Sequence, residues 1–290
     1  MSNKIALGTA QFGLVYGVAN KVGQVKKTEV AEILELASKF NITTLDTATA
    51  YGDSEKVLGS VGVDRWQIIS KLPALPANII DVDGWVEGQV HDSCQRLRVE
   101  RLYGLLLHRP GQLMEPRGEE IRDALYKLKK NGLVEKVGIS VYDPDELGPI
   151  FSRMKVDIVQ APFSIVDQRL ATSGWIRRLQ DEGCELHVRS VFLQGLLLMN
   201  LGQRPRQFDR WQGLWKSWDI WLKEAEVTPL EACLRFVLSV EGISKVVLGV
   251  ESTLQLKEIS KAVSGRLPAL PESFSLCDKE LLNPALWENK

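Results

Sequence analysis

Short apolar runs alternate with amphipathic helical stretches along the whole chain. Eight runs have the length and composition of strands, at residues 5–7, 43–45, 68–70, 105–107, 137–139, 158–159, 186–188 and 246–248. Between them, apolar residues such as Val30, Ile33, Leu34 and Ala37 recur at the spacing of one helix face. The strand-like runs barely alternate with polar residues, which is typical of parallel strands buried on both faces. We therefore predict an α/β fold, a (β/α)8 TIM-type barrel that forms a single domain over residues 1–290.

Two segments depart from this rhythm. After the seventh strand, some forty residues precede the next clear helical pattern, at 230–240, and they contain Trp211, Trp215, Trp218 and Trp221 on one helical face. This stripe indicates a helix docked by its aromatic side chains, and the same helix could also form a wall of a substrate pocket. The last stretch, residues 265–290, is rich in proline and polar residues and predicts a tail over the barrel surface.

Composition excludes several classes of protein. The 290 residues are 44% hydrophobic and 25% charged, with a net charge of −1, so nothing indicates a nucleic-acid surface. No apolar run is long enough to span a membrane, and the N-terminus lacks the apolar region of a signal peptide. The four cysteines are far apart and form no C-x-x-C pair. We expect a cytoplasmic protein with neither a metal site nor a disulfide framework.

Polar residues stand at the carboxyl ends of all eight predicted strands. They are Gly8 with Thr9, Asp46, Lys71, His108, Ser140, Gln160, Arg189 with Ser190, and Gly249. Chemistry in a barrel of this type takes place at the carboxyl ends of the strands. A barrel without a site there would not need these groups, because each costs desolvation unless it is paired. The sequence thus predicts an active site at this end.

Three of these residues form an acid–base device together with a tyrosine from a loop. Asp46, Lys71 and His108 end adjacent strands, so their side chains can converge, and Tyr51 lies five residues past Asp46 in the following loop. A phenol titrates near pH ~10, and a neighbouring ammonium group stabilises its phenolate form. Asp46 would keep the lysine charged and in place, and His108 would hydrogen-bond a carbonyl oxygen and orient it. The set predicts a site that protonates a carbonyl oxygen.

Several short motifs of the chain resemble those of the aldo-keto reductase family. The matching segments are 8–13 (GTAQFG), 45–52 (LDTATAYG), 70–71 (SK), 107–109 (LHR), 138–140 (GIS), 159–160 (VQ), 189–190 (RS), 194–197 (QGLL) and 248–252 (LGVES). The resemblance covers about residues 4 to 265 and implies a reductase that takes a hydride from NADPH or NADH. It implies a small-molecule carbonyl substrate, an aldehyde or a ketone. It also implies that Asp46, Tyr51, Lys71 and His108 are the catalytic residues.

The resemblance also assigns residues to the cofactor. Ser140 and Gln160 would hold the nicotinamide carboxamide, with Gly8 and Thr9 nearby. Ser190 and the loop from Leu193 to Gly195 would contact the pyrophosphate. The segment that opens the last helix would meet the adenosine end, where a helix N-terminus suits a phosphate; its residues are Gly249, Glu251, Ser252 and Gln255.

Three features depart from the family pattern. Arg189 stands where many members stack an aromatic ring on the nicotinamide, although a planar guanidinium can also stack. Val141 replaces an asparagine that often follows Ser140. At the adenosine end, Glu251 and Gln255 replace basic residues, and a carboxylate beside a phosphate is unfavourable. The resemblance implies NADP as the expected cofactor, with NAD as the alternative.

Two other functions fit parts of the same pattern. A Schiff-base aldolase on this barrel would use Lys71 as its nucleophile, but would not require Tyr51 and His108 together. A regulatory protein of the same fold would bind the cofactor without rapid turnover. The complete set of four residues favours the reductase, because fold alone does not decide function.

Overall fold

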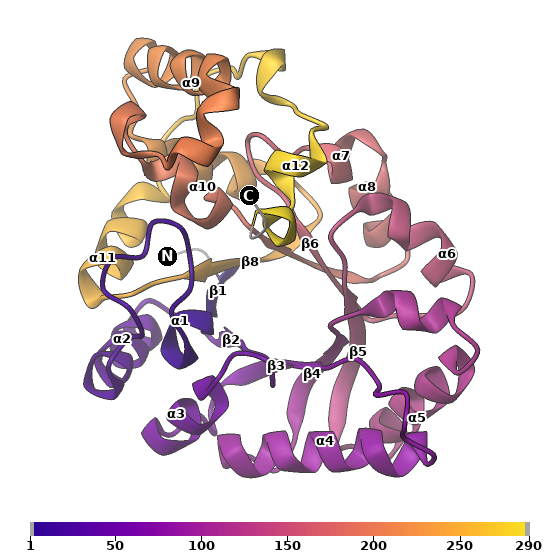
Figure 1. The fold of residues 1–290 in the computed structure, drawn as a ribbon. Coiled ribbons are helices and arrows are strands. Elements are labelled where there is room, and N and C mark those ends of the chain that lie inside the picture. The colour runs from indigo at the N-terminus through magenta and orange to yellow at the C-terminus, as the bar shows by residue number, and fades with distance from the viewer. Residues whose placement is uncertain (1–2, 288–290) are drawn as a thin grey trace.

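The computed structural model describes residues 3–287 and contains a closed parallel barrel whose eight strands follow one another in chain order (Figure 1). The last strand pairs with the first, from Ile5 with Val246 to Gly8 with Gly249, and this pairing closes the sheet. The predicted single-domain (β/α)8 fold is therefore confirmed. The strands are β1 Ile5–Gly8, β2 Thr44–Asp46, β3 Gln67–Leu72, β4 Leu102–Leu107, β5 Val134–Ser140, β6 Ile158–Pro162, β7 Glu185–Arg189 and β8 Ile243–Gly249.

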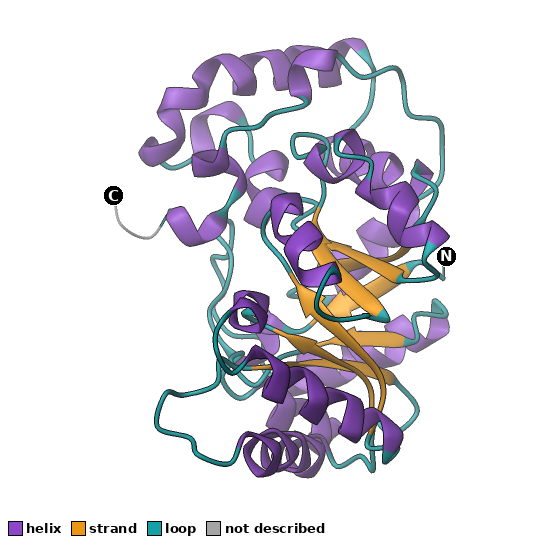
Figure 2. Cartoon of the chain, turned by 90° about the vertical axis from the view of Figure 1, so that its right-hand side faces the viewer, coloured by secondary structure: helices purple, strands orange, loops and turns teal. Residues whose placement is uncertain are grey.

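Helices surround the strands on the outside (Figures 1 and 2). Each main helix buries an apolar face against the barrel, as α2 does with Val30, Ile33, Leu34 and Ala37. The helices that follow the strands are α1 Ala10–Gly13, α2 Lys27–Lys39, α3 Ser54–Val61, α4 Val82–Leu97, α5 Gly118–Lys130, α6 Leu147–Phe151, α7 Arg169–Thr172, α8 Trp175–Asp181, α10 Pro229–Ser239 and α11 Thr253–Ala262. None of the described helices combines the length and the apolar character that crossing a membrane requires.

The predicted strands were correct in number and order, but seven were too short and the second, predicted at 43–45, lies one residue later. The structure extends β4 back to Leu102 and β5 back to Val134, and β3 runs on through Lys71 to Leu72. Inside the barrel, Ile69, Leu106 and Ile158 form a small apolar layer that separates the two ends. The polar residues at the carboxyl ends therefore lie on a solid floor rather than over a pore.

The tryptophan stripe is buried, as the docking hypothesis predicted. Trp215, Trp218 and Trp221 lie on α9 (Gln212–Glu224) and are each less than one tenth exposed. Each indole N–H finds a backbone carbonyl: Trp218 donates to Leu197 at 3.1 Å, and Trp221 donates to Ala269 at 3.1 Å. None of the four tryptophans is among the described residues that line the main cavity. The three tryptophans on α9 thus hold this helix against the loop after β7 and the C-terminal segment.

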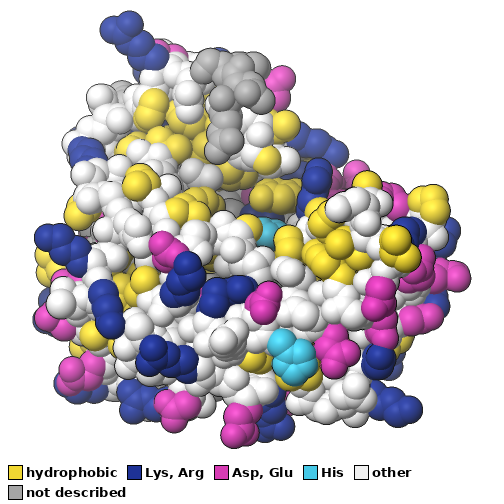
Figure 3. Space-filling model, turned by 60° about the horizontal axis from the view of Figure 1, so that its bottom comes forward, with side chains coloured by type: hydrophobic (Ala, Val, Ile, Leu, Met, Phe, Trp, Pro, Cys, Tyr) yellow, Lys and Arg dark blue, Asp and Glu magenta, His cyan; other side chains and the backbone are white. Residues whose placement is uncertain are grey.

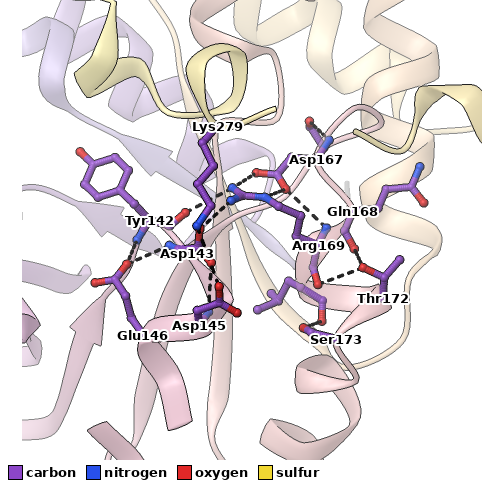
Figure 4. A network of polar contacts seen from close by, with 12 residues as sticks. Tyr142, Asp143, Asp145, Glu146, Asp167, Gln168, Arg169, Thr172, Ser173 and Lys279 are labelled. Atoms are coloured by element: carbon purple, nitrogen blue, oxygen red, sulfur yellow. Dashed lines mark hydrogen bonds and ion pairs between the residues drawn. The ribbon is translucent and has the colours of Figure 1, made fainter. Parts of the chain in front are cut away.

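The C-terminal segment returns across the barrel and packs there through Phe274, Leu281 and Leu282, which are buried. Its short helix α12 (Lys279–Leu282) lies beside the loops that follow β5 and β6 (Figures 1 and 4). Figure 4 shows Lys279 pointing at Asp143, with Nζ 2.6 Å from the carboxylate. Arg169 approaches the same carboxylate at 3.0 Å. Two cations from separate segments thus share one anion.

The surface carries charges of both signs. On the face drawn in Figure 3, Lys and Arg side chains are intermixed with Asp and Glu over the lower part, while apolar side chains gather toward the upper part. This mixture agrees with the net charge of −1. The face shown offers no broad basic surface of the kind that binds nucleic acid.

Candidate active site

A buried ion pair lies at the carboxyl end of the barrel. Asp46 ends β2 and Lys71 lies near the end of β3, so the parallel register brings the two side chains together. Lys71 Nζ is 2.6 Å from Asp46 Oδ1 and also donates to the carbonyl of Thr47 at 2.9 Å. Lys71 is 1% exposed and Asp46 is 3% exposed, so the pair is shielded from water and salt.

The charge state of Lys71 follows from these neighbours. Burial alone would lower the pKa of the ammonium group, but the carboxylate of Asp46 and the phenol of Tyr51 outweigh burial. The pKa of Lys71 therefore lies above its usual value, and the side chain is a cation at neutral pH. A Schiff-base nucleophile must be a neutral amine, so this environment disfavours the aldolase.

Tyr51 covers the ion pair from the side of the solvent. Lys71 Nζ is 4.8 Å from the centre of the tyrosine ring, a cation–π arrangement. Gly13 makes this position accessible to the loop, since a Cβ there would overlap the carbonyl oxygen of Tyr51 and the amide nitrogen of Ser54. Only glycine allows the segment after β1 to approach the tyrosine loop this closely.

His108 completes the predicted set of four. It follows β4, and its ring meets that of Tyr51 edge to face, with centres 6.1 Å apart and planes at 84°. Burial, with the positive charges of Lys71 and Arg189, lowers the pKa of His108 to about 4. The imidazole is therefore neutral at pH 7, with one nitrogen that donates and one that accepts.

The low pKa of His108 gives a test by stability. Between the usual histidine pKa of 6.5 and the folded value of about 4, the unfolded chain binds a proton that the folded chain does not. The free energy of unfolding should therefore fall by about 2–3 kcal/mol as the pH drops through this window. His108→Gln should remove that part of the slope in urea titrations from pH 7 to pH 4, whereas His91→Gln, at an exposed position, should keep it. An unchanged slope in His108→Gln would contradict the assignment.

A cavity of about 330 Å³ opens beside Tyr51 and continues to the N-terminus of α11. Most of the residues that the sequence predicted for the cofactor lie along it. These are Gly8, Thr9, Arg189, Ser190, Gly195, Gly249, Glu251 and Gln255, together with Asp46 and Tyr51 of the catalytic set. Six predicted site residues lie outside its lining: Lys71, His108, Ser140, Gln160, Leu193 and Ser252.

Ser140 and Gln160 lie under the site. Gln160 is fully buried, and its Nε2 donates to Asp46 Oδ2 at 2.6 Å. The hydroxyl of Ser140 donates to Gln160 Oε1 at 3.4 Å. Both carboxylate oxygens of Asp46 are thus satisfied, one by Lys71 and the other by Gln160. In this arrangement the two residues orient Asp46, a contact that the strand-end pattern did not indicate.

The loop after β7 has an unusual backbone. Ser190, Leu193 and Gln194 have φ values of 61°, 49° and 51°, in the left-handed region that non-glycine residues rarely occupy. Gly195 follows at 93°, and a Cβ there would overlap the side chain of Ala19. Such strain persists at functional sites, and left-handed turns form concave surfaces that bind anions. The loop therefore suits the predicted pyrophosphate contact.

Two tyrosines at the site escaped the sequence analysis. Tyr16, from the loop between α1 and α2, lines the cavity. Tyr142 stacks on Arg189, whose guanidinium carbon is 4.3 Å from the ring centre and whose Nη2 donates to the carbonyl of Val141 at 3.0 Å. Tyr142 stands two residues past the end of β5, so a search slightly beyond each strand end would have found it. Tyr16 lies in a long loop with no comparable signal.

No metal site accompanies these groups. Within residues 3–287, no three His, Cys, Asp or Glu side chains are grouped in a way that could hold a metal ion. The chemistry that the described residues themselves offer is a phenol, a buried ammonium–carboxylate pair and a neutral imidazole.

Comparison with known proteins places this barrel in a family. The model of the aldo/keto reductase family matches residues 4–279. The oxidoreductase YqkF of Bacillus subtilis, described as uncharacterized, is 23% identical over 264 residues that cover 83% of this chain and 84% of the relative. The oxidoreductase sirO of Leptosphaeria maculans is 27% identical over 219 residues, covering 71% of this chain and 65% of the relative.

Solved structures agree on the fold. A holo-form aldo-keto reductase from Bacillus halodurans superposes with a TM-score of 0.72 at 21% identity, covering 92% of this chain and 88% of that one. A glycerol dehydrogenase from Gluconobacter oxydans gives a TM-score of 0.69 at 18% identity, covering 93% and 88%. The protein is thus a (β/α)8 barrel with its polar groups at the carboxyl ends of the strands. It belongs to the aldo/keto reductase family and is an oxidoreductase.

Proposed function

We propose that the protein reduces an aldehyde or ketone to an alcohol with NADH or NADPH as the hydride donor. The observation that carries the proposal is the buried Asp46–Lys71 pair directly beneath the ring of Tyr51. Tyr51 lies at the wall of a cavity that continues to a helix N-terminus. A proton source therefore stands at one end of a channel long enough to bring a second reactant to it.

The residues along the cavity fit a nicotinamide dinucleotide. When bound, the nicotinamide supplies the hydride. Arg189 would lie against its ring, and the strained loop from Ser190 to Gly195 would face the pyrophosphate. The start of α11 would meet the adenosine end. Ser140 and Gln160 would act through Asp46, and their direct contact with the carboxamide stays a prediction.

The chain's own residues would handle the proton. Tyr51 donates its hydroxyl proton to the carbonyl oxygen of the substrate, and the positive charge of Lys71 stabilises the phenolate that remains. Asp46 keeps Lys71 charged and fixed, held in turn by Gln160. The neutral imidazole of His108, beside Tyr51, donates a hydrogen bond to the same oxygen and orients it.

A panel of aldehydes, ketones and sugars with NADH and with NADPH tests this proposal through the absorbance of the reduced nicotinamide. Oxidation of the cofactor that depends on a carbonyl substrate is the expected result. Cofactor binding without turnover on any substrate would instead support the regulatory protein. Borohydride trapping of a covalent adduct at Lys71 would support the aldolase.

The cellular compartment is part of the same proposal. Cys94, Cys184, Cys233 and Cys277 are all unpaired, and the first three are buried. Free thiols persist in a reducing environment. We therefore place the reaction in the cytoplasm, where reduced nicotinamide would serve as the reductant.

A further inference from the structure

The end of the cavity away from Tyr51 lies at the N-terminus of α11. Glu251 precedes this helix and Glu258 lies within it, and both line the cavity. A third carboxylate comes from α2, where Glu29 Oε1 accepts a hydrogen bond from the backbone N–H of Thr253 at 2.7 Å. Resting on the proposed function, we propose that the protein selects NADH over NADPH and that Glu29 is a residue that enforces this choice.

Two of the first N–H groups of α11 already have side-chain partners. A helix N-terminus binds phosphate because its first N–H groups lack partners and carry partial positive charge. Here Thr253 donates to Glu29, and the N–H of Gln255 donates to Ser252 Oγ at 3.2 Å. Just before the helix, the N–H of Glu251 donates to Gln255 Oε1 at 2.8 Å. A 2′-phosphate that bound the N–H groups of Thr253 or Gln255 would have to displace these partners, and the partner of Thr253 is a carboxylate.

The distribution of charged residues along the cavity also favours NADH over NADPH. Among the described residues that line the cavity, Arg189 is the one Lys or Arg, and it lies beside Tyr142 at the catalytic end. The adenosine end has Glu251 and Glu258 in its wall and Glu29 behind it. The dianionic 2′-phosphate of NADPH would meet carboxylates there, and no Lys or Arg among the described lining residues of that end offsets the repulsion.

The same carboxylates suit NADH. The adenosine ribose of NADH carries a free 2′-hydroxyl group, which can donate a hydrogen bond to an acidic side chain. Glu251 and Glu258 face the cavity and can accept it. Carboxylates at this end therefore favour the cofactor that lacks the phosphate and disfavour the one that carries it.

Fluorescence titration of the full chain with NADH and NADPH separates the possible outcomes. We expect the wild-type protein to bind NADH at least about tenfold more tightly than NADPH. Glu29→Gln keeps an oxygen that can accept from Thr253 but removes the charge, so the preference should shrink several-fold. Glu35→Gln, which makes the same change on an exposed turn of α2, should leave the preference unchanged. Glu251→Arg should shift it toward NADPH by about tenfold or more, because arginine offers a charge-assisted contact to phosphate.

The titrations distinguish a failure of the proposed function from a failure of the proposed cofactor selectivity. If neither cofactor binds, the proposed function is wrong, whatever the carboxylates do. If NADPH binds as tightly as NADH, the function stands and the inference on selectivity is overturned. If the preference for NADH is present but Glu29→Gln leaves it intact, the role of Glu29 is overturned. Thermal unfolding of Glu29→Gln beside Glu29→Ala shows whether the hydrogen bond to Thr253 survives, since only alanine removes the acceptor.

Discussion

Tyr51→Phe is expected to lower turnover by about 10²–10⁴-fold, the contribution of a positioned general acid, while the cofactor binds almost as before. The substitution removes one hydroxyl group. The ring would keep its place over Lys71 and its edge contact with His108. A loss confined to the chemical step would therefore show that the hydroxyl is the proton donor.

Two measurements check this expectation. Steady-state turnover follows the absorbance of the reduced nicotinamide, and fluorescence titration gives the cofactor affinity. Tyr126→Phe is the matched control, because Tyr126 lies on α5 with its hydroxyl bonded to the backbone of Lys155, away from the cavity. Turnover by Tyr51→Phe at the level of this control would rule out the proposed acid.

Lys71→Met is expected to lower turnover by about 10²-fold or more, because the phenolate loses the cation that stabilises it. The same substitution also leaves the buried carboxylate of Asp46 without its ion-pair partner. Removing one partner of a buried ion pair costs about 3–5 kcal/mol of stability.

The double variant Asp46→Asn/Lys71→Met separates catalysis from folding. It removes both charges, so stability should recover toward the wild-type value while turnover stays low. Urea unfolding and steady-state turnover are the measurements. A Lys71→Met protein with wild-type turnover would show that Lys71 does not act on Tyr51.

Much of the barrel and its catalytic group could be predicted because both depend on local pattern. A buried parallel strand is a short apolar run, and the residue at its end faces the site. Asp46 and Lys71 were therefore identifiable one strand at a time, and the parallel register brings them to 2.6 Å. The approximate positions of helices such as α2 followed the apolar spacing of the segments between the strands.

Contacts between distant segments could not be predicted in this way. Gln160 lies at a strand end as expected, but the path of its side chain to Asp46 depends on packing across the barrel. Glu29 lies 224 residues before Thr253, and its carboxylate accepts a hydrogen bond from the N–H of that residue. In the sequence, Glu29 is an ordinary polar residue of a helix, so nothing there indicates this contact. Tyr16 depends on the course of a loop without periodic pattern.

The closure of the barrel has a consequence for the making of the protein. Ribosomal synthesis releases β1 first, but the partner that closes it, β8, begins only at Ile243. The salt bridge from Lys279 to Asp143 forms later still, when the last helix has emerged. A nascent chain thus carries Asp46, Tyr51 and Lys71 long before the sheet that supports them has both edges joined. Growing polypeptides should expose that open edge to chaperones, and activity should appear only after β8 has emerged and joined β1.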